Sequence, residues 1–167
     1  MRLNELLGGE FEAGMSSADL NHIRISGITC NSSAVHEGYL FAAIPGTQTD
    51  GRQFIPDALS RGAAAVLAPP GTLMHPSDVK VPFLLNKNPR RQYARMAARF
   101  YEKQPKKIAC VTGTNGKTSV VSFLRQIWAA AGYRAASSGT LGVELAGYSD
   151  GLAPKLHCTS DLTTPDP

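Results

Sequence analysis

A glycine-rich turn between an apolar strand pattern and a helical pattern constrains the fold of this chain more than any other feature. The turn is Thr112–Thr118, and it follows the short apolar segment Ile108–Val111. Behind it, apolar residues recur at helical spacing until Gly132, and a glycine there is typical of a helix end. A strand, a glycine loop and a helix in this order begin a βαβ unit. The sequence therefore predicts an α/β fold, with the next parallel strand around Tyr133–Ala136.

The same turn carries the residue types that phosphate binding requires. Its glycines let backbone N–H groups approach phosphate oxygens closely, and the positive end of the following helix lies behind them. Lys117 would place a positive charge beside the β- and γ-phosphates, and the Thr118 hydroxyl would ligate Mg²⁺. With Lys117 as the catalytic residue, we predict a phosphate-binding loop of Gly113, Thr114, Asn115, Gly116, Lys117, Thr118 and Ser119.

The spacing of this loop departs from the strict pattern G-x-x-x-x-G-K-[ST]. Val111 stands five residues before Gly116, where that pattern has a glycine. The loop is thus a contracted version, and the alternative interpretation is an ordinary βα turn that contains two glycines. The strand before it, the helix after it and the Lys-Thr pair favour phosphate binding.

The first 88 residues show the short apolar segments of a small α/β domain. Apolar or alternating runs bounded by turn residues predict strands at His22–Ile28, Tyr39–Ile44, Ala63–Ala68 and Val81–Leu85. Helical spacing predicts a short starting helix around Leu3–Leu7 and a second helix at Gln53–Ser60. Pro82 indicates that the last strand lies at a sheet edge or begins there.

The chain changes its pattern at Asn88–Pro89. Asparagine is a strong helix N-cap and proline suits the first helical position. Apolar residues then follow at helical spacing, which predicts an amphipathic helix that ends near Pro105. We therefore predict two domains, residues 1–88 and 89–167.

Composition and charge narrow the classes of partner. Lys and Arg number 17 against 13 Asp and Glu, a net charge of +4 that suits an anionic small molecule and is too small and scattered for nucleic acid. The three cysteines form no CxxC pair, so neither a zinc site nor a disulfide scaffold is indicated. The sequence shows no signal-peptide pattern and no apolar run of ~20 residues, so we expect a cytoplasmic protein without membrane insertion. We also expect a monomer.

The sequence pattern predicts that the second domain is incomplete. One strand–helix–strand pass does not close a doubly wound sheet, and the segment Ser137–Pro167 is polar and rich in loop residues. The sequence also shows no second carboxylate for Mg²⁺ near the loop. We therefore expect the chain to be cut off inside this domain.

Val111–Ser119 resembles the ATP loop of the Mur ligases, the ATP-dependent amide-forming enzymes of peptidoglycan synthesis. The uridine-nucleotide-binding domain of that family is resembled by the blocks Asn31–Ser33 and Gly38–Ala43 and by the residues Gly46, Asp50, Gly51, Phe54, Ile55, Ala58, Gly62 and Ala63. Gly139–Gly142 and Thr163–Asp166 resemble the members that add the third peptide residue. Folylpolyglutamate synthetases share Gly-Thr-Asn-Gly-Lys but continue with Gly-Ser, where this chain has Thr-Ser.

The resemblance implies a small N-terminal α/β uridine-nucleotide-binding domain, followed by the truncated start of a P-loop, Rossmann-like parallel-sheet ATPase domain. It implies ATP and Mg²⁺ as cofactors. It implies UDP-MurNAc-L-Ala-D-Glu and a diamino acid, meso-diaminopimelate or L-lysine, as substrates joined through an acyl phosphate. It assigns the glycine loop to ATP and assigns contacts with the UDP-linked substrate to Cys30, Ser32, Thr47, Gln48, Thr49, Thr163 and Thr164.

The chain also departs from the family. Asn31–Ser33 reads Asn-Ser-Ser where the family has Asp-Ser-Arg, so an acid and a base are missing while the serine stays. The parts that finish the ligase site are absent, so we expect this chain alone to be inactive. Two alternatives stay open: a nucleotide-binding P-loop module without ligase chemistry, and a folylpolyglutamate-type ligase.

Overall fold

A computed structural model of the chain describes residues 1–8, 20–46, 49–72 and 81–147. The chain forms two compact units, Met1–Gln104 and Pro105–Pro167. The compact units thus divide after Gln104, and the domain boundary at 88/89 stays a prediction. The helix that follows Asn88 packs against the first unit and belongs to it.

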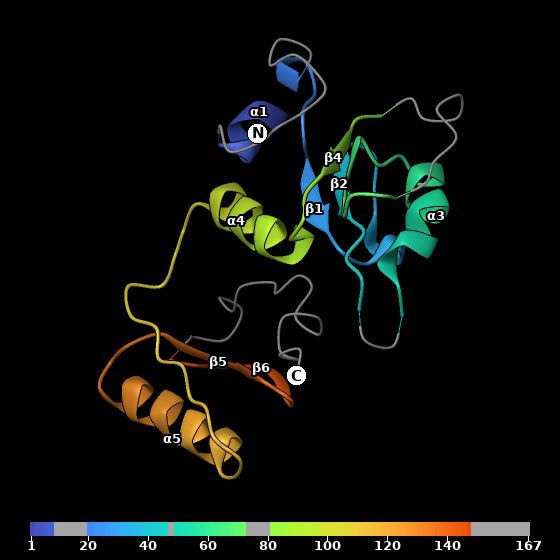
Figure 1. The fold of residues 1–167 in the computed structure, drawn as a ribbon. Helices are drawn as coiled ribbons and strands as arrows, with labels where there is room; N and C mark the ends of the chain where they lie inside the picture. Colours follow the sequence, from blue (N-terminus) through green and yellow to red (C-terminus); the bar gives the residue numbers. More distant parts are fainter. Residues whose placement is uncertain (9–19, 47–48, 73–80, 148–167) are drawn as a thin grey trace. The chain divides into compact units, whose positions relative to one another are not determined.

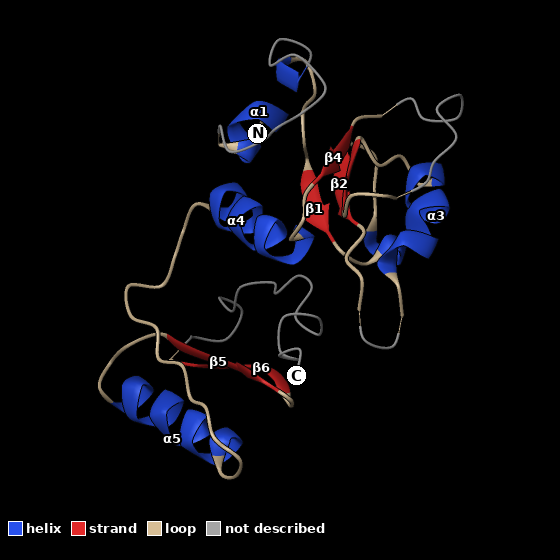
Figure 2. Ribbon diagram, in the orientation of Figure 1, coloured by secondary structure: helices blue, strands red, loops and turns tan. Residues whose placement is uncertain are grey.

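The first unit is built on a four-stranded sheet, drawn in red in Figure 2. Its strands β1 to β4 lie in sequential order. All three pairings are parallel. The strands are β1 Gly27–Thr29, β2 Tyr39–Ala42, β3 Ala65–Ala68 and β4 Phe83–Leu85. The last three confirm the predicted strands, and β4 lies at the sheet edge directly after Pro82, as the proline indicated.

β1 begins later than the alternation of apolar residues predicted. Ile23 and Ile25 bond to the N-terminal segment, with Leu3 N–H donating to Ile23 O at 2.9 Å and Ile25 N–H to Met1 O at 2.9 Å, and only Ser26 bonds toward β2, through Gly38 O. A half-buried alternating segment satisfies its backbone groups with any neighbouring chain, so the pattern alone does not define which partner it pairs with.

Helices cover both faces of this sheet (Figure 1). Helices α1 Leu3–Leu7 and α4 Pro89–Tyr101 lie on one face. The 3-10 turns η1 Ser32–Ala34 and η2 Gly51–Phe54 belong to the other face, together with helix α3 Ile55–Ser60. The strands supply alternate residues to the two cores, with Leu40 facing α1 and α4 and its neighbour Phe41 facing α3. Right-handed crossovers between sequential parallel strands place their connections on one face, as observed for η1 and α3.

Helix α4 belongs to the first unit because its apolar stripe is buried there. Tyr93 is 5% exposed and Met96 is 0% exposed, and both join the core that contains α1. The Asn88 side chain caps the helix by accepting from Arg91 N–H at 2.9 Å, as predicted. Arg99 reaches back to donate to the carbonyl of Leu7 at 2.8 Å, which ties the end of α4 to the end of α1.

The described part of the second unit contains helix α5 Lys117–Ala130 and a hairpin of strands β5 Ala135–Gly139 and β6 Gly142–Ala146 (Figure 2). β5 and β6 pair antiparallel. The prediction that Tyr133–Ala136 forms a parallel neighbour of Ile108–Val111 is wrong for the described residues, and the start of the segment predicted to be rich in loop residues carries most of this hairpin. The turn at Thr140–Leu141 brings the two strands together at little entropic cost, so local pairing forms without a distant partner.

Ile108–Val111 does not form the predicted strand. In the described part of the chain these residues have no ladder partner, and Ile108 is 73% exposed. An apolar run becomes a strand only when another strand satisfies its backbone groups, and none of the described segments does so here. The α/β class with a parallel sheet is thus confirmed in the first unit, while a P-loop sheet around this segment stays a prediction.

Candidate functional site

The glycine loop lies directly before α5 and has the backbone conformation that only glycines adopt easily. Gly113 has φ 142° and Gly116 has φ 74°. Gly116 is the N-cap of α5, so the helix begins at Lys117 and its first N–H groups point toward the loop. The structure thereby confirms the predicted order of glycine loop and helix.

The loop is open to an incoming anion. A Cβ placed on Gly116 would meet nothing within 4 Å, and one on Gly113 would meet only the Asn115 carbonyl at 4.0 Å. Every residue from Gly113 to Ser119 is exposed. Free backbone donors, a helix N-terminus and open space are the features that phosphate-binding loops share.

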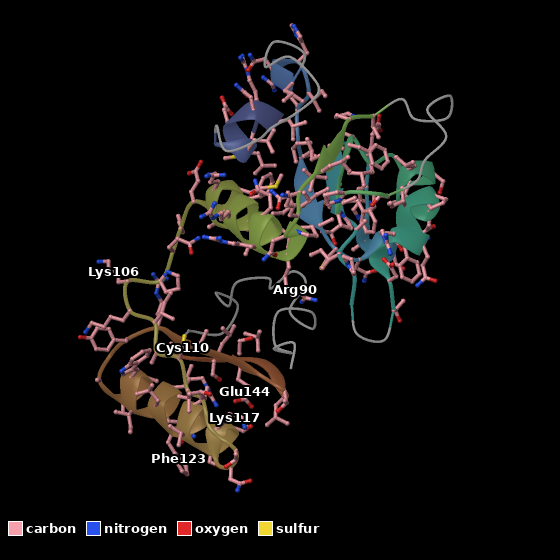
Figure 3. All side chains as sticks on the ribbon, viewed as in Figure 1. Arg90, Lys106, Cys110, Lys117, Phe123 and Glu144 are labelled. Atoms are coloured by element: carbon pink, nitrogen blue, oxygen red, sulfur yellow. The ribbon has the colours of Figure 1, made fainter. Side chains whose placement is uncertain are left out.

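Lys117 folds over the loop that it follows (Figure 3). Its ammonium group donates to the carbonyl of Gly113 and, at 3.3 Å, to the carbonyl of Thr114. The positive charge is thereby held above the turn rather than extended into solvent. A phosphate seated on the loop would lie within reach of this ammonium group.

Thr118 offers one hard oxygen ligand at the start of α5. Within the described ranges no three His, Cys, Asp or Glu side chains gather into a metal cluster. The donor chemistry fits Mg²⁺ that is held mainly by phosphate oxygens and touches the protein through one hydroxyl.

The second group of predicted residues lies at the carboxyl edge of the parallel sheet. Cys30 and Ser32 follow the end of β1, and Thr49 lies in the connection that follows β2. Because β1 and β2 are parallel neighbours, these two connections leave the sheet side by side. Ligands of parallel α/β sheets bind outside this edge. Thr47, Gln48, Thr163 and Thr164 lie outside the described residues.

Local hydrogen bonds shape the turn that carries Ser32. Asn31 N–H donates to Thr29 Oγ1 at 3.1 Å, and the Asn31 side chain accepts from Ser33 N–H at 3.0 Å. Asn31 is the N-cap of η1. An asparagine oxygen caps a turn as an aspartate does, so this departure from the family pattern preserves the backbone of the turn.

Backbone contacts join the two described ends of the connection after β2. Pro45 and Asp50 face each other as an antiparallel bridge, and Gly46 N–H donates to Thr49 O at 3.0 Å. Arg52 forms a two-pronged ion pair with Asp50, with Nε at 2.8 Å from Oδ2. This side-chain hydrogen bonding to Arg52 lowers the pKa of the Asp50 carboxyl. The Asp50 side chain also caps η2 by accepting from Arg52 N–H.

Asp57 on α3 is a polar contact of the candidate site that the sequence did not reveal. Arg61 Nε donates to its carboxylate at 2.9 Å, and hydrogen bonding with the Ser32 side chain, the larger cause, and with Arg61 lowers the pKa of Asp57. The spacing of Asp57 and Arg61 was a visible signal for their ion pair on a helix. No local signal connects Ser32 with Asp57, because tertiary packing of η1 on α3 brings them together.

None of the helices in the described part of the chain is long and apolar enough to cross a membrane.

Family comparisons match both units. The model described as "Mur ligase family, catalytic domain" matches residues 24–101, and the model "Mur ligase middle domain" matches residues 111–167. The two matches therefore cover most of the chain, and the first reaches the end of α4, in keeping with the boundary between the compact units.

Individual relatives share substantial identity with the chain. A Rhizobium meliloti protein named UDP-N-acetylmuramoyl-L-alanyl-D-glutamate--2,6-diaminopimelate ligase is 44% identical over 100% of this chain and 32% of its own length. A protein of the same name from Caulobacter vibrioides is 48% identical over 85% of this chain and 28% of its own length. The chain thus spans about a third of the length of the curated relatives it matches.

A solved structure also resembles the chain. It is described as MurF ligase from Thermotoga maritima in complex with ADP, with 28% identity and a TM-score of 0.49, and the match covers 70% of this chain and 25% of that one. The two family models and the named relatives agree with one another over residues 24–101 and 111–167. The chain belongs to the Mur ligase family.

Proposed function

We propose that the chain supplies the nucleotide-binding parts of an ATP-dependent amide ligase, UDP-N-acetylmuramoyl-tripeptide synthetase. This enzyme would join a diamino acid to UDP-MurNAc-L-Ala-D-Glu. The observation that carries the proposal is the open glycine loop before α5, with Lys117 held above it. The names of the relatives favour 2,6-diaminopimelate over lysine as the added residue.

The reaction requires activation of a carboxylate, because a carboxylate is a poor electrophile and hydroxide is a poor leaving group. Transfer of the γ-phosphoryl group of ATP to the D-glutamate carboxylate gives an acyl phosphate and ADP. The amine of the diamino acid then attacks the acyl carbon, and phosphate leaves with the bond electrons. The loop's part in this scheme is electrostatic: Lys117 and the backbone N–H groups offset the charge on the transferring phosphoryl group.

Gly113, Thr114, Asn115, Gly116, Lys117, Thr118 and Ser119 would hold the ATP phosphates, and Thr118 would contribute a hydroxyl to Mg²⁺. When bound, Mg²⁺ neutralises phosphate charge. The chain's own loop orients the phosphates against the start of α5, which places them in line with the helix dipole.

The UDP end of the substrate would bind at the carboxyl edge of the first unit. Support comes from Cys30, Ser32 and Thr49, which follow neighbouring parallel strands at the edge where such sheets bind ligands. The proposal also assigns Thr47 and Gln48 to this end, and Thr163 and Thr164 to the muramoyl-peptide portion. Because the reaction consumes ATP, we place it in the cytoplasm and propose a monomer that binds no nucleic acid.

Two experiments test this function. The first titrates the 167-residue chain with UDP and, separately, with Mg·ATP in a calorimeter. We expect measurable UDP binding, weak ATP binding and no amide product. No uridine binding at millimolar ligand would contradict the assignment of the first unit.

The second experiment tests the ligase chemistry in a chimera. This chain replaces the matching segment of the Rhizobium meliloti relative, and ligation is measured with 2,6-diaminopimelate and with lysine. Lys117→Ala should lower turnover by about 10²–10³-fold, on the scale of losing one preorganised donor, while Lys117→Arg retains part of it. The melting temperature should not change, because Lys117 is exposed. Near-normal turnover of the Ala variant would contradict the role of Lys117, and binding without ligation by the unaltered chimera would favour a nucleotide-binding module.

A further inference from the structure

The first turn of α4 stands at the carboxyl edge of the parallel sheet. Directly after β4, Asn86 N–H donates to Ala68 O at 3.0 Å, and three residues later the chain enters the helix. Arg90 lies at the start of α4 (Figure 3), and its Nη2 donates at 3.5 Å to Pro45 O in the connection after β2. The start of α4 therefore borders the connection that carries Thr49, at the edge where parallel sheets bind ligands.

Positive charge gathers around this first turn. Lys87 precedes the helix cap, Arg90 and Arg91 follow it, and the sequence from Val81 to Tyr101 contains no aspartate or glutamate. The N-terminus of a helix is itself the positive end of its dipole, so cations there are repelled rather than stabilised. An anion bound at this turn would offset both the side-chain charges and the dipole.

A buried donor without an acceptor is the second feature of this turn. Gln92 is only 4% exposed and lies on the buried side of α4 with Pro89, Tyr93 and Met96. Its Nε2 group is buried and has no hydrogen-bond partner among the residues that the structure describes. Side chains of an α-helix lean toward its N-terminus, so this amide is directed toward the first turn. The unmet donor destabilises the free chain, and an oxygen atom of a ligand would remove that cost.

We propose that the start of α4 is the diphosphate subsite of the uridine nucleotide, with Gln92 and Arg90 donating to phosphate oxygens. This subsite rests on the proposed uridine-nucleotide function. Diphosphate oxygens are charged acceptors, so they match both an unmet amide donor and a cluster of cations, whereas a neutral base or ribose would leave the positive charge unmatched. The terminal torsion of glutamine is broad, so a small rotation turns Nε2 toward such an oxygen. Arg90 presents the planar fork of donors that suits a phosphate.

The test measures UDP binding to the full chain by calorimetry. Gln92→Met keeps the size of the side chain and removes the donor, so it should weaken UDP binding about tenfold, on the scale of one hydrogen bond to a charged group. Its melting temperature should stay the same or rise, because an unmet buried donor is gone. Arg90→Ala should weaken UDP binding at least as much. Arg95→Ala is the matched control, an exposed arginine beyond the first turn of α4, and should bind UDP as the unaltered chain does.

Ligands that lack one part of UDP locate the contact. Uridine has no phosphate and should bind the unaltered chain and both variants alike, whereas inorganic pyrophosphate should bind both variants less tightly than the unaltered chain. If Gln92→Met and Arg90→Ala weaken uridine as much as UDP, these residues hold the nucleoside and the diphosphate subsite is overturned. Pyrophosphate binding that neither substitution changes would belong to the glycine loop and would overturn it too.

Failure of the subsite and failure of the proposed function give different results. A lower melting temperature of Gln92→Met with unchanged UDP binding would make Gln92 purely structural and refute the subsite, while the uridine function stands. If Gln92→Met does not fold, Arg90→Ala decides, and an unaltered UDP affinity of that variant refutes the subsite. Absence of UDP binding to the unaltered chain would refute the uridine function, and pyrophosphate binding that still depends on Arg90 would then support an anion site at α4 without it. Binding of neither ligand would refute both.

Discussion

Arg125 on α5 donates to the carboxylate of Glu144 on β6 at 2.8 Å. The same guanidinium donates to the backbone carbonyl of Leu145 at 3.4 Å. These contacts tie the helix that follows the glycine loop to the hairpin. Apolar packing on the other side of α5 is sparse, since Phe123 is 63% exposed and points away from the hairpin (Figure 3).

We expect Arg125→Ala to lower the free energy of unfolding of the second unit by about 1 kcal/mol. Arg125 is the more buried partner, with 14% of its side chain exposed against 44% for Glu144, so solvent screens part of the ion pair. Urea unfolding followed by fluorescence of Trp128, the chain's single tryptophan, reports this unit because Trp128 lies on α5. Glu144→Gln keeps an oxygen for the guanidinium and should cost less. Equal stability of all three proteins would contradict the contact.

Substitutions of Gly116 test whether the left-handed backbone conformation of the loop is needed for nucleotide binding. Its φ of 74° strains a residue with a Cβ, although a Cβ there would meet nothing within 4 Å. Gly116→Ala should therefore weaken Mg·ATP binding by about fivefold, through the conformational cost alone, which is about 1 kcal/mol. Gly116→Asn should bind closer to the unaltered chain, because asparagine tolerates this region better. If alanine binds as well as glycine, the left-handed conformation is not required for nucleotide binding.

Limited trypsin digestion tests the boundary between the units. The residues from Tyr101 to Cys110 are all exposed, and Lys103, Lys106 and Lys107 lie between α4 and the glycine loop. We expect the first cuts at these lysines, which would leave α4 with the first unit. Arg91 and Arg95 are exposed too but lie within α4, so they serve as the internal control. Early cleavage at Arg91 or Arg95, detected by mass spectrometry, would place the boundary nearer Asn88.

The first unit should lose stability in acid. The pKa of Asp57 is lowered by its bonds with Ser32 and Arg61, and that of Asp50 by Arg52. A carboxyl whose folded pKa lies below its unfolded value stabilises the folded state above the unfolded pKa, and this stabilisation is lost as the pH falls through the folded pKa. Stability measured by denaturant should therefore begin to fall below about pH 4. Asp57→Asn should show a shallower fall, and an unchanged pH profile would argue against these contacts in solution.

Much of the local structure was predictable from short-range patterns. The Asn88 cap and the helix after it, strands β2 to β4 and the glycine loop before α5 all occur where the sequence predicts them. Each depends on residues close together in the chain: a cap on one side chain, a strand on an apolar run, a left-handed turn on a glycine. The resemblance of Val111–Ser119 and of the separate N-terminal blocks to Mur ligases indicated the family that the comparisons show.

Tertiary contacts decided the features that these patterns leave open. An apolar run predicts a strand but does not predict which strand it pairs with. In the structure β5 pairs with β6 in a hairpin, while Ile108–Val111 has no ladder partner among the described residues. Interactions of polar side chains also depend on tertiary packing. Ser32 influences the pKa of Asp57 because η1 packs on α3. The sequence by itself therefore determined the α/β segments, the helix cap and the glycine loop before α5. The tertiary structure decided strand partners, the unit boundary after α4 and the polar network of the sheet edge, because hydrogen bonds and burial between distant residues depend on how the whole chain packs.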